Sequence, residues 1–382
     1  MFISDTHLPQ LLPAHAYHDE AWYEREVEKA LLPAWHLVAT SGDFPRDGSF
    51  VSLKLLGRPL LLRRDGGEIH GFLNVCPHRF ATLTDAPRGC TAVLKCGYHG
   101  WEFDGCSGST RRIPDAPAFR PLEKGQLGLT QVQVEVCGGL VFVSVGQPQQ
   151  SVTTQLAACD CEPAVHTSHH GEIGRREVLL PVNWKVAVEN TLESYHVAEV
   201  HPRTFTTAPP ENACRHELTT AGSCFSGPGD TRRTVVGLER LLLGRLGLSR
   251  HGGYRHTHLH PTFTLAATDS FAILLSFLPE SARLTRLVVA WFARQSGSSR
   301  TLADRLLRIW AGMQSRFWLQ VVGEDAAIVP RVQAGLEATA QPGGGLISRR
   351  EERIVHFQRW LLDRLELPVP VAAQPMSQGA GP

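Results

Sequence analysis

Four side chains of the kinds that bind metals lie in two short loops of the chain. Cys76 and His78 are two residues apart, Cys96 and His99 are three apart, and seventeen residues separate His78 from Cys96. Two thiolates and two imidazoles can hold a [2Fe–2S] cluster, with both cysteines on one iron and both histidines on the other. The pattern therefore predicts an electron-transfer centre.

Two other interpretations of these loops are open. A structural zinc site also uses cysteine and histidine, but its ligands usually come as C-x2-C or H-x3-H pairs. The third interpretation is that the four residues are unrelated loop positions. The mixture of ligand types within each loop favours a cluster whose two irons differ chemically.

A second group with metal-binding chemistry lies further along the chain. Glu193 and His196 are three residues apart, so on a helix they share a surface. Pro202 disfavours helical geometry at His201, so we expect a helix to end there and His201 to turn back towards the metal. Two histidines and one carboxylate on one face of an iron leave open positions for oxygen and substrate. The alternative is two ordinary histidines, one in the core and one at a helix end.

Two further clusters carry weaker signals. His256, His258 and His260 alternate along a predicted strand and so share one face. We expect them to line a pocket or a polar sheet surface, with a three-histidine metal site as the alternative. Cys159 and Cys161 lie near several histidines, but their spacing matches no regular metal site.

Composition narrows the functional class. The 382 residues suffice for two domains. Lys and Arg number 38 against 37 for Asp and Glu, which argues against a nucleic-acid partner bound through phosphate neutralisation. No apolar run is long enough to span a bilayer, and no signal peptide is visible. We therefore expect no membrane partner and a cytoplasmic location, in which the cysteines outside the cluster are reduced thiols.

The first part of the chain predicts a helix followed by β structure. Asp19 is a candidate N-cap for a helix through about Leu32. Short strand-like segments separated by Gly and Pro follow, with Gly66-Gly67 as a hairpin signal. We expect an arm and helix over residues 1–36 and a small β domain over 37–145 that carries both cysteine–histidine loops.

The remainder predicts a second domain over residues 146–366 and a disordered tail over 367–382. We expect a helix from Trp184 to about His201, a short helix over 238–248, strands over 263–265, 270–278 and 284–292, and a closing helix over 351–365. Thr301 is a candidate cap for a helix that ends at Gly323-Glu324-Asp325, with Pro330 interrupting a second segment. The apolar face of that helix carries Leu302, Leu306, Ile309, Met313, Phe317 and Val321.

At its metal-binding motifs the chain resembles the large, terminal-oxygenase subunit of the Rieske non-haem iron oxygenases. The resemblance rests on C-P-H-R and C-x-Y-H-G-W in the first loops, on N-W-K, E-N and E-x-x-Y-H-x4-H-P between Asn183 and Pro202, and on E-D followed by V-Q-x-G-L between Glu324 and Leu336. It extends from about residue 17 to 365. The chain departs from the commonest pattern at Phe80, where Gly usually follows Arg, and at Gly97, where Pro is frequent.

The resemblance implies an α+β fold with an N-terminal Rieske [2Fe–2S] β domain and a C-terminal helix-grip catalytic domain, an antiparallel sheet curved around a long helix. It implies that Glu193 links the iron's histidine to the cluster histidine of a neighbouring subunit in a homotrimer. It also implies two sets of metal ligands: Cys76, His78, Cys96 and His99 for the cluster, and His196, His201 and Asp325, rather than Glu324, for a mononuclear Fe(II).

The implied partners are O2, a small-molecule substrate and a separate NAD(P)H-dependent reductase, acting directly or through a ferredoxin. The family includes ring hydroxylases as well as a branch that acts on carnitine, betaine and related quaternary amines. Many ring hydroxylases have Asp where this chain has Glu193; the Glu resembles the quaternary-amine branch and some ring hydroxylases as well. Residues 204–300 hold one Tyr and one Trp, a thin supply for the aromatic cage that a cation prefers.

Several Phe side chains and apolar strands in the same domain suit an apolar pocket. We therefore expect hydroxylation of an aromatic or apolar small molecule, with a quaternary amine as the alternative. An electron carrier without the iron site and a ligand-binding protein with structural metals are the other classes that stay open.

Overall fold

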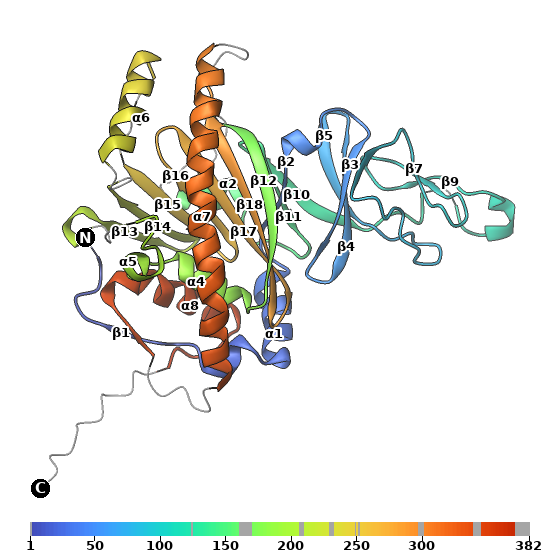
Figure 1. The fold of residues 1–382 in the computed structure, drawn as a ribbon. Coiled ribbons are helices and arrows are strands. Elements are labelled where there is room, and N and C mark those ends of the chain that lie inside the picture. Colours follow the sequence, from blue (N-terminus) through green and yellow to red (C-terminus); the bar gives the residue numbers. More distant parts are fainter. Residues whose placement is uncertain are drawn as a thin grey trace, which may run out of the picture.

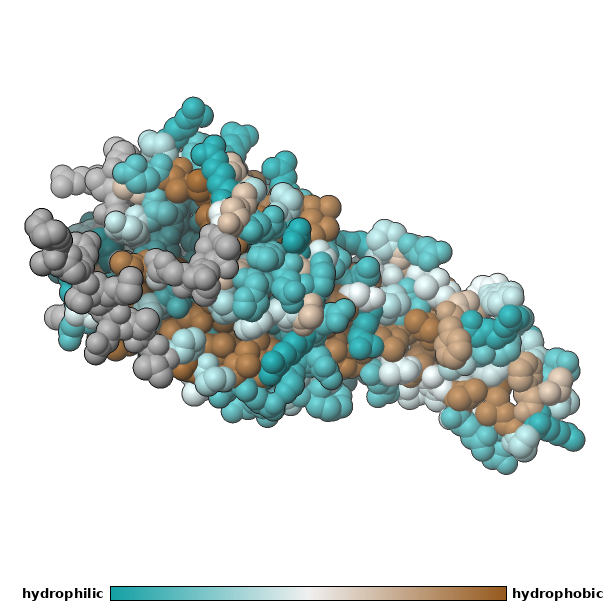
Figure 2. All heavy atoms as spheres, turned by 90° about the horizontal axis from the view of Figure 1, so that it is seen from below, coloured by the Kyte–Doolittle hydropathy of each residue, from teal (hydrophilic) through white to brown (hydrophobic). Residues whose placement is uncertain are grey.

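The computed structural model describes residues 2–123, 125–159, 170–205, 210–228, 233–248, 250, 253–296, 302–338 and 345–370. It has two parts, a β domain and a larger domain in which helices cover an antiparallel sheet, as an α+β fold requires (Figure 1). None of the helices in these residues is both long and apolar enough to cross a membrane. Seen from below, both parts show apolar patches within a mainly hydrophilic surface (Figure 2).

The β domain contains a seven-stranded antiparallel sheet in the order β2-β11-β10-β5-β4-β3-β6 and a three-stranded sheet β7-β8-β9. The Gly66-Gly67 hairpin is confirmed: Asp65 pairs with Glu68, and both glycines have positive φ, which glycine adopts readily. The bounds are β2 His36–Thr40, β3 Ser49–Leu55, β4 Arg58–Asp65, β5 Glu68–Leu73, β6 Arg88–Cys90, β7 Leu94–Lys95, β8 Glu102–Phe103, β9 Thr110–Arg112, β10 Gln131–Cys137 and β11 Leu140–Ser144.

The larger domain is built on a seven-stranded sheet in the order β12-β18-β17-β16-β15-β14-β13, in which every neighbouring pair is antiparallel. The predicted strands over 263–265, 270–278 and 284–292 are confirmed as β16, β17 and β18. The bounds are β12 His170–Leu180, β13 Arg215–Thr219, β14 Gly222–Gly227, β15 Tyr254–Leu259, β16 Phe263–Ala267, β17 Phe271–Ser281 and β18 Leu284–Arg294; the short strands β1 Leu8–Pro9 and β19 Leu346–Ile347 pair with each other elsewhere.

Helices surround this sheet, and α7 runs along its face (Figure 1). The Asp19 cap is confirmed, since its side chain accepts a hydrogen bond from the Trp22 amide, and α1 continues as a π-helical turn over Val27–Leu31. The predicted closing helix is confirmed as α8. The bounds are α1 Glu20–Glu26, α2 Val152–Ala158, α4 Trp184–Thr191, α5 Val197–Val200, α6 Arg233–Arg245, α7 Leu302–Ala338 and α8 Glu352–Arg364.

The structure corrects the prediction for α7. The helix does not end at Gly323-Glu324-Asp325 but runs unbroken through Gly323 and Pro330 for 37 residues. The sheet and α4 pack along it, and tertiary packing of this kind outweighs the helix-breaking tendencies of single residues. Its predicted apolar face is not a core face throughout: Leu302, Leu306, Ile309 and Met313 are exposed. The predicted cap Thr301 lies outside the described residues.

One apolar core joins the two domains. It contains Leu60 and Val141 of the β domain together with Phe271, Phe277 and Val289 of the larger one. The Ser276 hydroxyl of β17 also donates to the Leu37 carbonyl of β2 at 2.9 Å. The two metal-binding regions are therefore held on one scaffold.

Candidate metal centres

The two cysteine–histidine loops have the same backbone design. In the first, the Cys76 amide donates to the Ala81 carbonyl and the Phe80 amide donates back to the Cys76 carbonyl; in the second, Cys96, Gly100 and Trp101 repeat this pattern. Each loop turns at a residue with positive φ four positions after its cysteine, Phe80 in the first and Gly100 in the second. This explains why Gly is usual at position 80: the turn needs a conformation that glycine adopts freely and that costs other residues, including the Phe80 of this chain, roughly 1–2 kcal/mol. At Gly97 a Cβ would meet no atom within 4 Å, so the packing does not require glycine there.

The loops bring their four candidate ligands together. Cys76 and Cys96 are buried in one small apolar cluster, and the His78 and His99 ring centroids lie 4.6 Å apart. The His78 ring stacks on Trp101 with an interplanar angle of 5°, which fixes its orientation. Burial lowers the pKa of His78, so the imidazole is neutral as a metal ligand must be.

These residues fit a cluster with one iron on the cysteines and one on the histidines. The Nδ1 atoms of His78 and His99 are both buried and have no hydrogen-bond partner among the described residues. Buried ring nitrogens normally find a partner, so two such atoms on adjacent rings are explained by a shared ligand. The cysteine side chains form the other half of the set.

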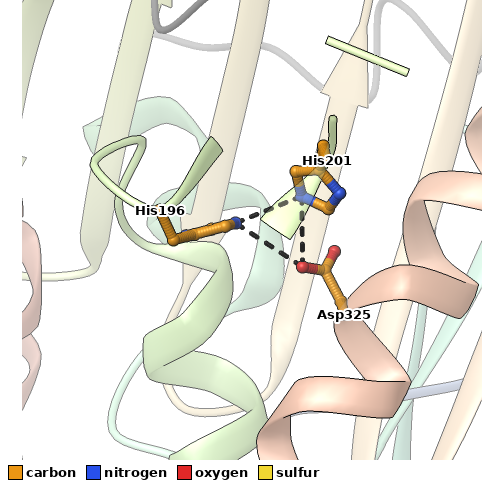
Figure 3. Close-up of side chains that lie close together, drawn as sticks. All are labelled: His196, His201 and Asp325. Atoms are coloured by element: carbon orange, nitrogen blue, oxygen red, sulfur yellow. Dashed lines mark hydrogen bonds and ion pairs between the residues drawn. The ribbon is translucent and has the colours of Figure 1, made fainter. Parts of the chain in front are cut away.

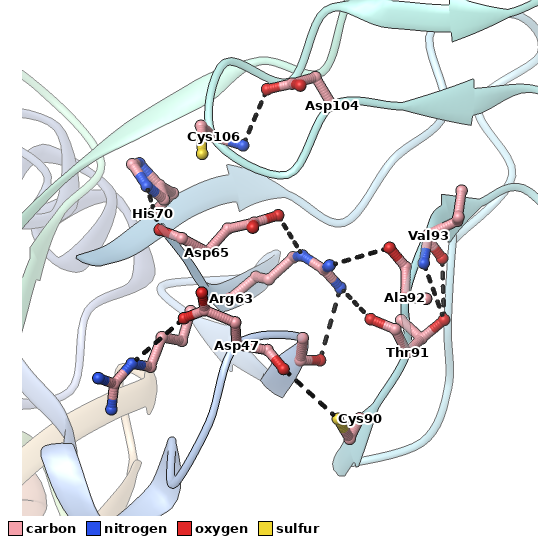
Figure 4. Close-up of polar contacts among 12 residues, drawn as sticks. Asp47, Arg63, Asp65, His70, Cys90, Thr91, Ala92, Val93, Asp104 and Cys106 are labelled. Carbon is pink, nitrogen blue, oxygen red and sulfur yellow. Dashed lines mark hydrogen bonds and ion pairs between the residues drawn. The ribbon is translucent and has the colours of Figure 1, made fainter. Parts of the chain in front are cut away.

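A buried arginine, Arg63, forms hydrogen bonds with the segment that leads into the second loop (Figure 4). Arg63 of β4 is 3% exposed; its guanidinium donates to the Thr91 carbonyl at 2.7 Å and to Asp65 at 3.2 Å. Thr91 precedes β7, which leads directly into Cys96. The arginine thus ties the strand core to the segment that positions one cluster cysteine.

The second centre consists of His196, His201 and Asp325 (Figure 3). The two histidine Nε2 atoms are 3.2 Å apart and lie 3.5 and 3.3 Å from Asp325 Oδ1. Among the described residues, only these three form a group of His, Cys, Asp or Glu side chains compact enough to hold one metal ion. The choice of Asp325 over Glu324 agrees with this geometry, because Asp325 faces the same point as both Nε2 atoms.

A carboxylate also forms a hydrogen bond with Nδ1 of each histidine, on the side of the ring away from Nε2. Glu193 bonds to His196 Nδ1, and Glu324 Oε2 lies 2.9 Å from His201 Nδ1 and accepts from the Thr204 hydroxyl at 2.8 Å. Such partners fix the ring orientation and leave Nε2 for a metal. The sequence prediction missed this role of Glu324, although its position beside Asp325 is a signal for it.

The electrostatics favour positive charge at this centre. Burial alone lowers the pKa of His196, but bonds to Asp325 and Glu193 outweigh it and raise that pKa to about 10. His196 and His201 lower the pKa of Asp325, although burial of this carboxyl group raises it. A proton on His196 supplies positive charge beside the carboxylates, and a divalent cation would displace it.

The structure corrects the predicted single helix around these residues. It breaks after α4: the Glu193 carboxylate accepts hydrogen bonds from the backbone amides of Tyr195 and His196 in the connecting turn, and the short helix α5 begins at Val197. The predicted end at His201 is confirmed, since its φ of −112° and ψ of 44° are not helical. The break turns His196 and His201 towards each other.

Buried polar contacts fix α4, the helix that precedes the centre. Glu26 and Lys185 form an ion pair at 2.7 Å with both side chains fully buried, and the Trp22 and Trp184 indoles donate to the same carboxylate at 2.8 Å. At the other end of α4, the Asn190 amide donates to Asp325 Oδ1 at 2.9 Å. The N-terminal segment is therefore part of the support for the candidate iron site.

The three-histidine metal site that the sequence left open as an alternative is absent from the described part of the chain. His256 meets Arg353 Nη2 at 3.1 Å, His258 contacts Thr264 at 3.0 Å, and His260 stacks on Trp360. Each of the three histidines therefore has a different partner, and they do not converge on one ion. Whether Cys159 and Cys161 share a metal site is not tested, because Cys161 lies outside the described residues.

A cavity of about 160 Å³ opens beside the centre and is lined by His196, His201 and Asp325. Its aromatic wall includes Phe205, Phe225, Tyr254, Phe317 and Trp318, and Tyr254 stacks on Trp318 with centroids 5.7 Å apart and an angle of 8°. Arg353, which is 2% exposed, also lines it. Trp318 and Phe317 come from α7, outside the segment 204–300 where the sequence analysis looked for pocket residues.

Comparison with known proteins matches both parts of the chain to known families. The family model for the ring hydroxylating alpha subunit (catalytic domain) matches residues 165–367, and that for the Rieske [2Fe-2S] domain matches residues 34–133. The chain is 26% identical to the chloroplastic choline monooxygenase of Spinacia oleracea over 384 residues, covering 95% of this chain and 79% of that protein.

Two groups of solved structures share the fold. A quaternary ammonium Rieske monooxygenase in complex with L-carnitine matches with a TM-score of 0.70 at 20% identity, covering 93% of this chain and 95% of the other. A naphthalene 1,2-dioxygenase variant bound to phenanthrene matches with a TM-score of 0.76 at 19% identity, covering 93% and 92%. The chain therefore belongs to the ring-hydroxylating alpha-subunit family and is the terminal oxygenase subunit of a Rieske non-haem iron oxygenase, with a [2Fe–2S] cluster and a mononuclear iron as cofactors.

Proposed function

We propose that Cys76, Cys96, His78 and His99 hold the cluster and that His196, His201 and Asp325 hold the mononuclear iron. Bound there, the iron would supply O2 activation with electrons delivered one at a time through the cluster. Glu193 and Glu324 orient the two histidines, Asn190 orients Asp325, and the apolar wall of the cavity limits water around the reacting bond.

We propose a quaternary amine carrying a carboxylate as the substrate, with oxidation at an N-methyl group. The observation that carries this proposal is the aromatic wall beside the metal centre, in which Tyr254 and Trp318 stack and Phe205 and Phe225 stand nearby. Aromatic faces attract quaternary ammonium groups. The guanidinium of Arg353 on the same cavity favours a betaine-type zwitterion over a simple cation such as choline.

The proposed reaction consumes one O2, two electrons and two protons. One oxygen atom enters a C–H bond of the methyl group to give N–CH2OH, and the other leaves as water. The N–CH2OH group then loses its hydroxyl proton as the C–N bond breaks, which gives formaldehyde and the demethylated amine. A separate reductase, acting directly or through a ferredoxin, supplies the electrons.

The second candidate is hydroxylation of an aromatic or apolar small molecule, which the sequence analysis favoured. It is supported by the apolar part of the same wall, including Ile273, Leu275 and Val321. Such a substrate would need no cation–π contact, so the two candidates predict different substrate panels.

The test is oxygen uptake with a supplied reductase. We expect glycine betaine to stimulate uptake with an equal amount of formaldehyde, and Trp318→Leu to raise the KM for it while iron is retained. Trp310→Leu, on the same helix but outside the cavity, is the matched control. Uptake with aromatic compounds and none with betaines would select the second candidate.

We also propose a homotrimer in which Glu193 of one subunit lies close to the cluster histidines of the next. Glu193 is mostly buried and holds its own His196. Phe80 and Tyr98, which are exposed on the cluster loops, suit a contact with a neighbouring subunit. A solution mass of three chains of 42.0 kDa is expected by light scattering, and a monomeric active enzyme would refute the arrangement.

A further inference from the structure

A small cavity adjoins the larger one beside the metal centre. It has a volume of about 30 Å³ and lies where α4 and α7 pack on strands β12, β17 and β18. Five residues line both cavities: Asn190, Thr191, Leu275, Val322 and Asp325. The small cavity therefore shares a boundary with the larger one, and the proposed iron ligand Asp325 is part of that boundary.

Beyond this boundary the wall of the small cavity is apolar. Two residues of this wall, Ala187 of α4 and Ala326 of α7, carry only a methyl group, which leaves space between the helices and the larger side chains of the sheet. Protein interiors contain few voids larger than a water molecule, so such a space is uncommon. The six residues that line only the small cavity, all buried except the half-buried Ala326, are Leu180, Ala187, Phe277, Leu287, Ala326 and Val329.

This cavity suits a small apolar molecule better than water. A cavity of roughly 10–15 Å³ can hold one water, but a buried water normally forms about three hydrogen bonds, and apolar cavities stay dry and bind xenon. The six apolar side chains offer a water no partner. At the boundary, the Asn190 amide donates to Asp325 Oδ1 at 2.9 Å and the Thr191 hydroxyl donates to the Val188 carbonyl at 2.8 Å, so these donors are already used.

O2 is the small apolar reactant of a Rieske oxygenase. It has no charge and no hydrogen to donate, so it moves favourably from water into apolar space. The larger cavity, of about 160 Å³, holds the organic substrate during turnover, and O2 must reach the same centre beside it. Only the smaller cavity offers O2 a separate space that borders Asp325 among the cavities formed by the described residues.

We propose that the small cavity is a binding site for O2. The molecule lies against Ala187, Phe277 and Val329 and passes to the metal centre across the boundary that Asn190 and Asp325 form. The site holds O2 beside the centre while the organic substrate fills the larger cavity. It serves a quaternary amine and an aromatic substrate equally.

Xenon tests the site without turnover, because it is an apolar atom that apolar cavities bind. In crystals of the holoenzyme under xenon pressure, we expect a xenon atom in contact with Ala187, Phe277 and Val329. Val329→Phe fills the cavity and is expected to exclude xenon, while the iron and cluster contents stay at the wild-type level. Val332→Phe is the matched control, because Val332 lies on the same helix, is exposed and lines neither cavity.

Oxygen kinetics test the role of the site. Uptake is measured with a supplied reductase and the organic substrate that supports turnover. Val329→Phe is expected to raise the KM for O2 roughly tenfold, because an apolar molecule of two heavy atoms loses about that much preference for the site. The KM for the organic substrate should not change, because Val329 does not line the larger cavity. Val329→Met adds less volume and should give a smaller increase, so it provides the test if Val329→Phe does not fold.

Three results would overturn the proposal. Ordered water in the wild-type cavity, with no xenon at any pressure, would assign the space to solvent. A wild-type KM for O2 in a variant that excludes xenon would mean that O2 reaches the centre by another path. Equal increases in the KM for O2 and for the organic substrate would mean that the substitution acts through the larger cavity.

Discussion

Glu324→Gln is expected to weaken iron binding without abolishing it. The substitution keeps the size of the side chain and an oxygen that can accept from His201 Nδ1, but removes the negative charge 2.9 Å from that nitrogen. A hydrogen bond to a charged group contributes roughly 1.5–3 kcal/mol, and loss of such a partner typically costs 10–100-fold in metal affinity, or about 1.4–2.8 kcal/mol. Asp325→Ala removes a proposed ligand and is expected to lose the iron completely.

Iron content after dialysis against graded chelator measures the difference, with the visible spectrum of the cluster as an internal standard. Glu217→Gln is the matched control, because Glu217 pairs with Arg215 at the surface of β13. Iron retention equal to wild type in Glu324→Gln would refute the orienting role. Complete loss in Glu324→Gln with retention in Asp325→Ala would reverse the assignment within the pair.

Three further predictions concern the cluster, the proposed electron path and the buried ion pair. Cys76→Ser is expected to abolish the reduced Rieske spectrum while mononuclear iron is retained, and a colourless wild-type protein with stoichiometric zinc would exclude the cluster. Glu193→Gln should keep both metals but lower turnover at least tenfold; a normal single-turnover rate contradicts this. Lys185→Met should lower the free energy of unfolding by about 3–5 kcal/mol at neutral pH, because it leaves the Glu26 carboxylate buried without its cation. Burial already raises the pKa of Glu26, so protonation at lower pH favours the folded variant; denaturation should show the deficit shrinking as pH falls, and a constant deficit would argue against this cause.

The residues with the most specific chemistry were predictable from the sequence. The two cysteine–histidine loops, the turn at His201 and the Gly66-Gly67 hairpin follow from local spacing and from backbone preferences that act within a few residues. Asp325 was different, since nothing in its local spacing marks it and only the family resemblance selected it.

The features that the sequence did not predict depend on tertiary contacts. After α4, the Glu193 carboxylate accepts hydrogen bonds from two backbone amides in the turn that leads to α5, and α7 continues through Pro330 where it packs on the sheet. Trp318 lines the cavity because α7 packs on the sheet and brings its ring against Tyr254, more than sixty positions away along the chain. Periodicity showed an apolar stripe at the start of α7 but not which part of it the rest of the molecule covers.

The unbroken course of α7 has a consequence for how this chain can diverge. Phe317, Trp318, Glu324 and Asp325 all project from one helix without an intervening loop. Inserting one residue between Leu302 and Phe317 would rotate the upstream and downstream faces by about 100° relative to each other and shift them by about 1.5 Å. Either the cavity wall and the carboxylate or the upstream packing would then face the wrong way. Length changes are therefore confined to the segments outside this helix, and its interior can vary only by substitution.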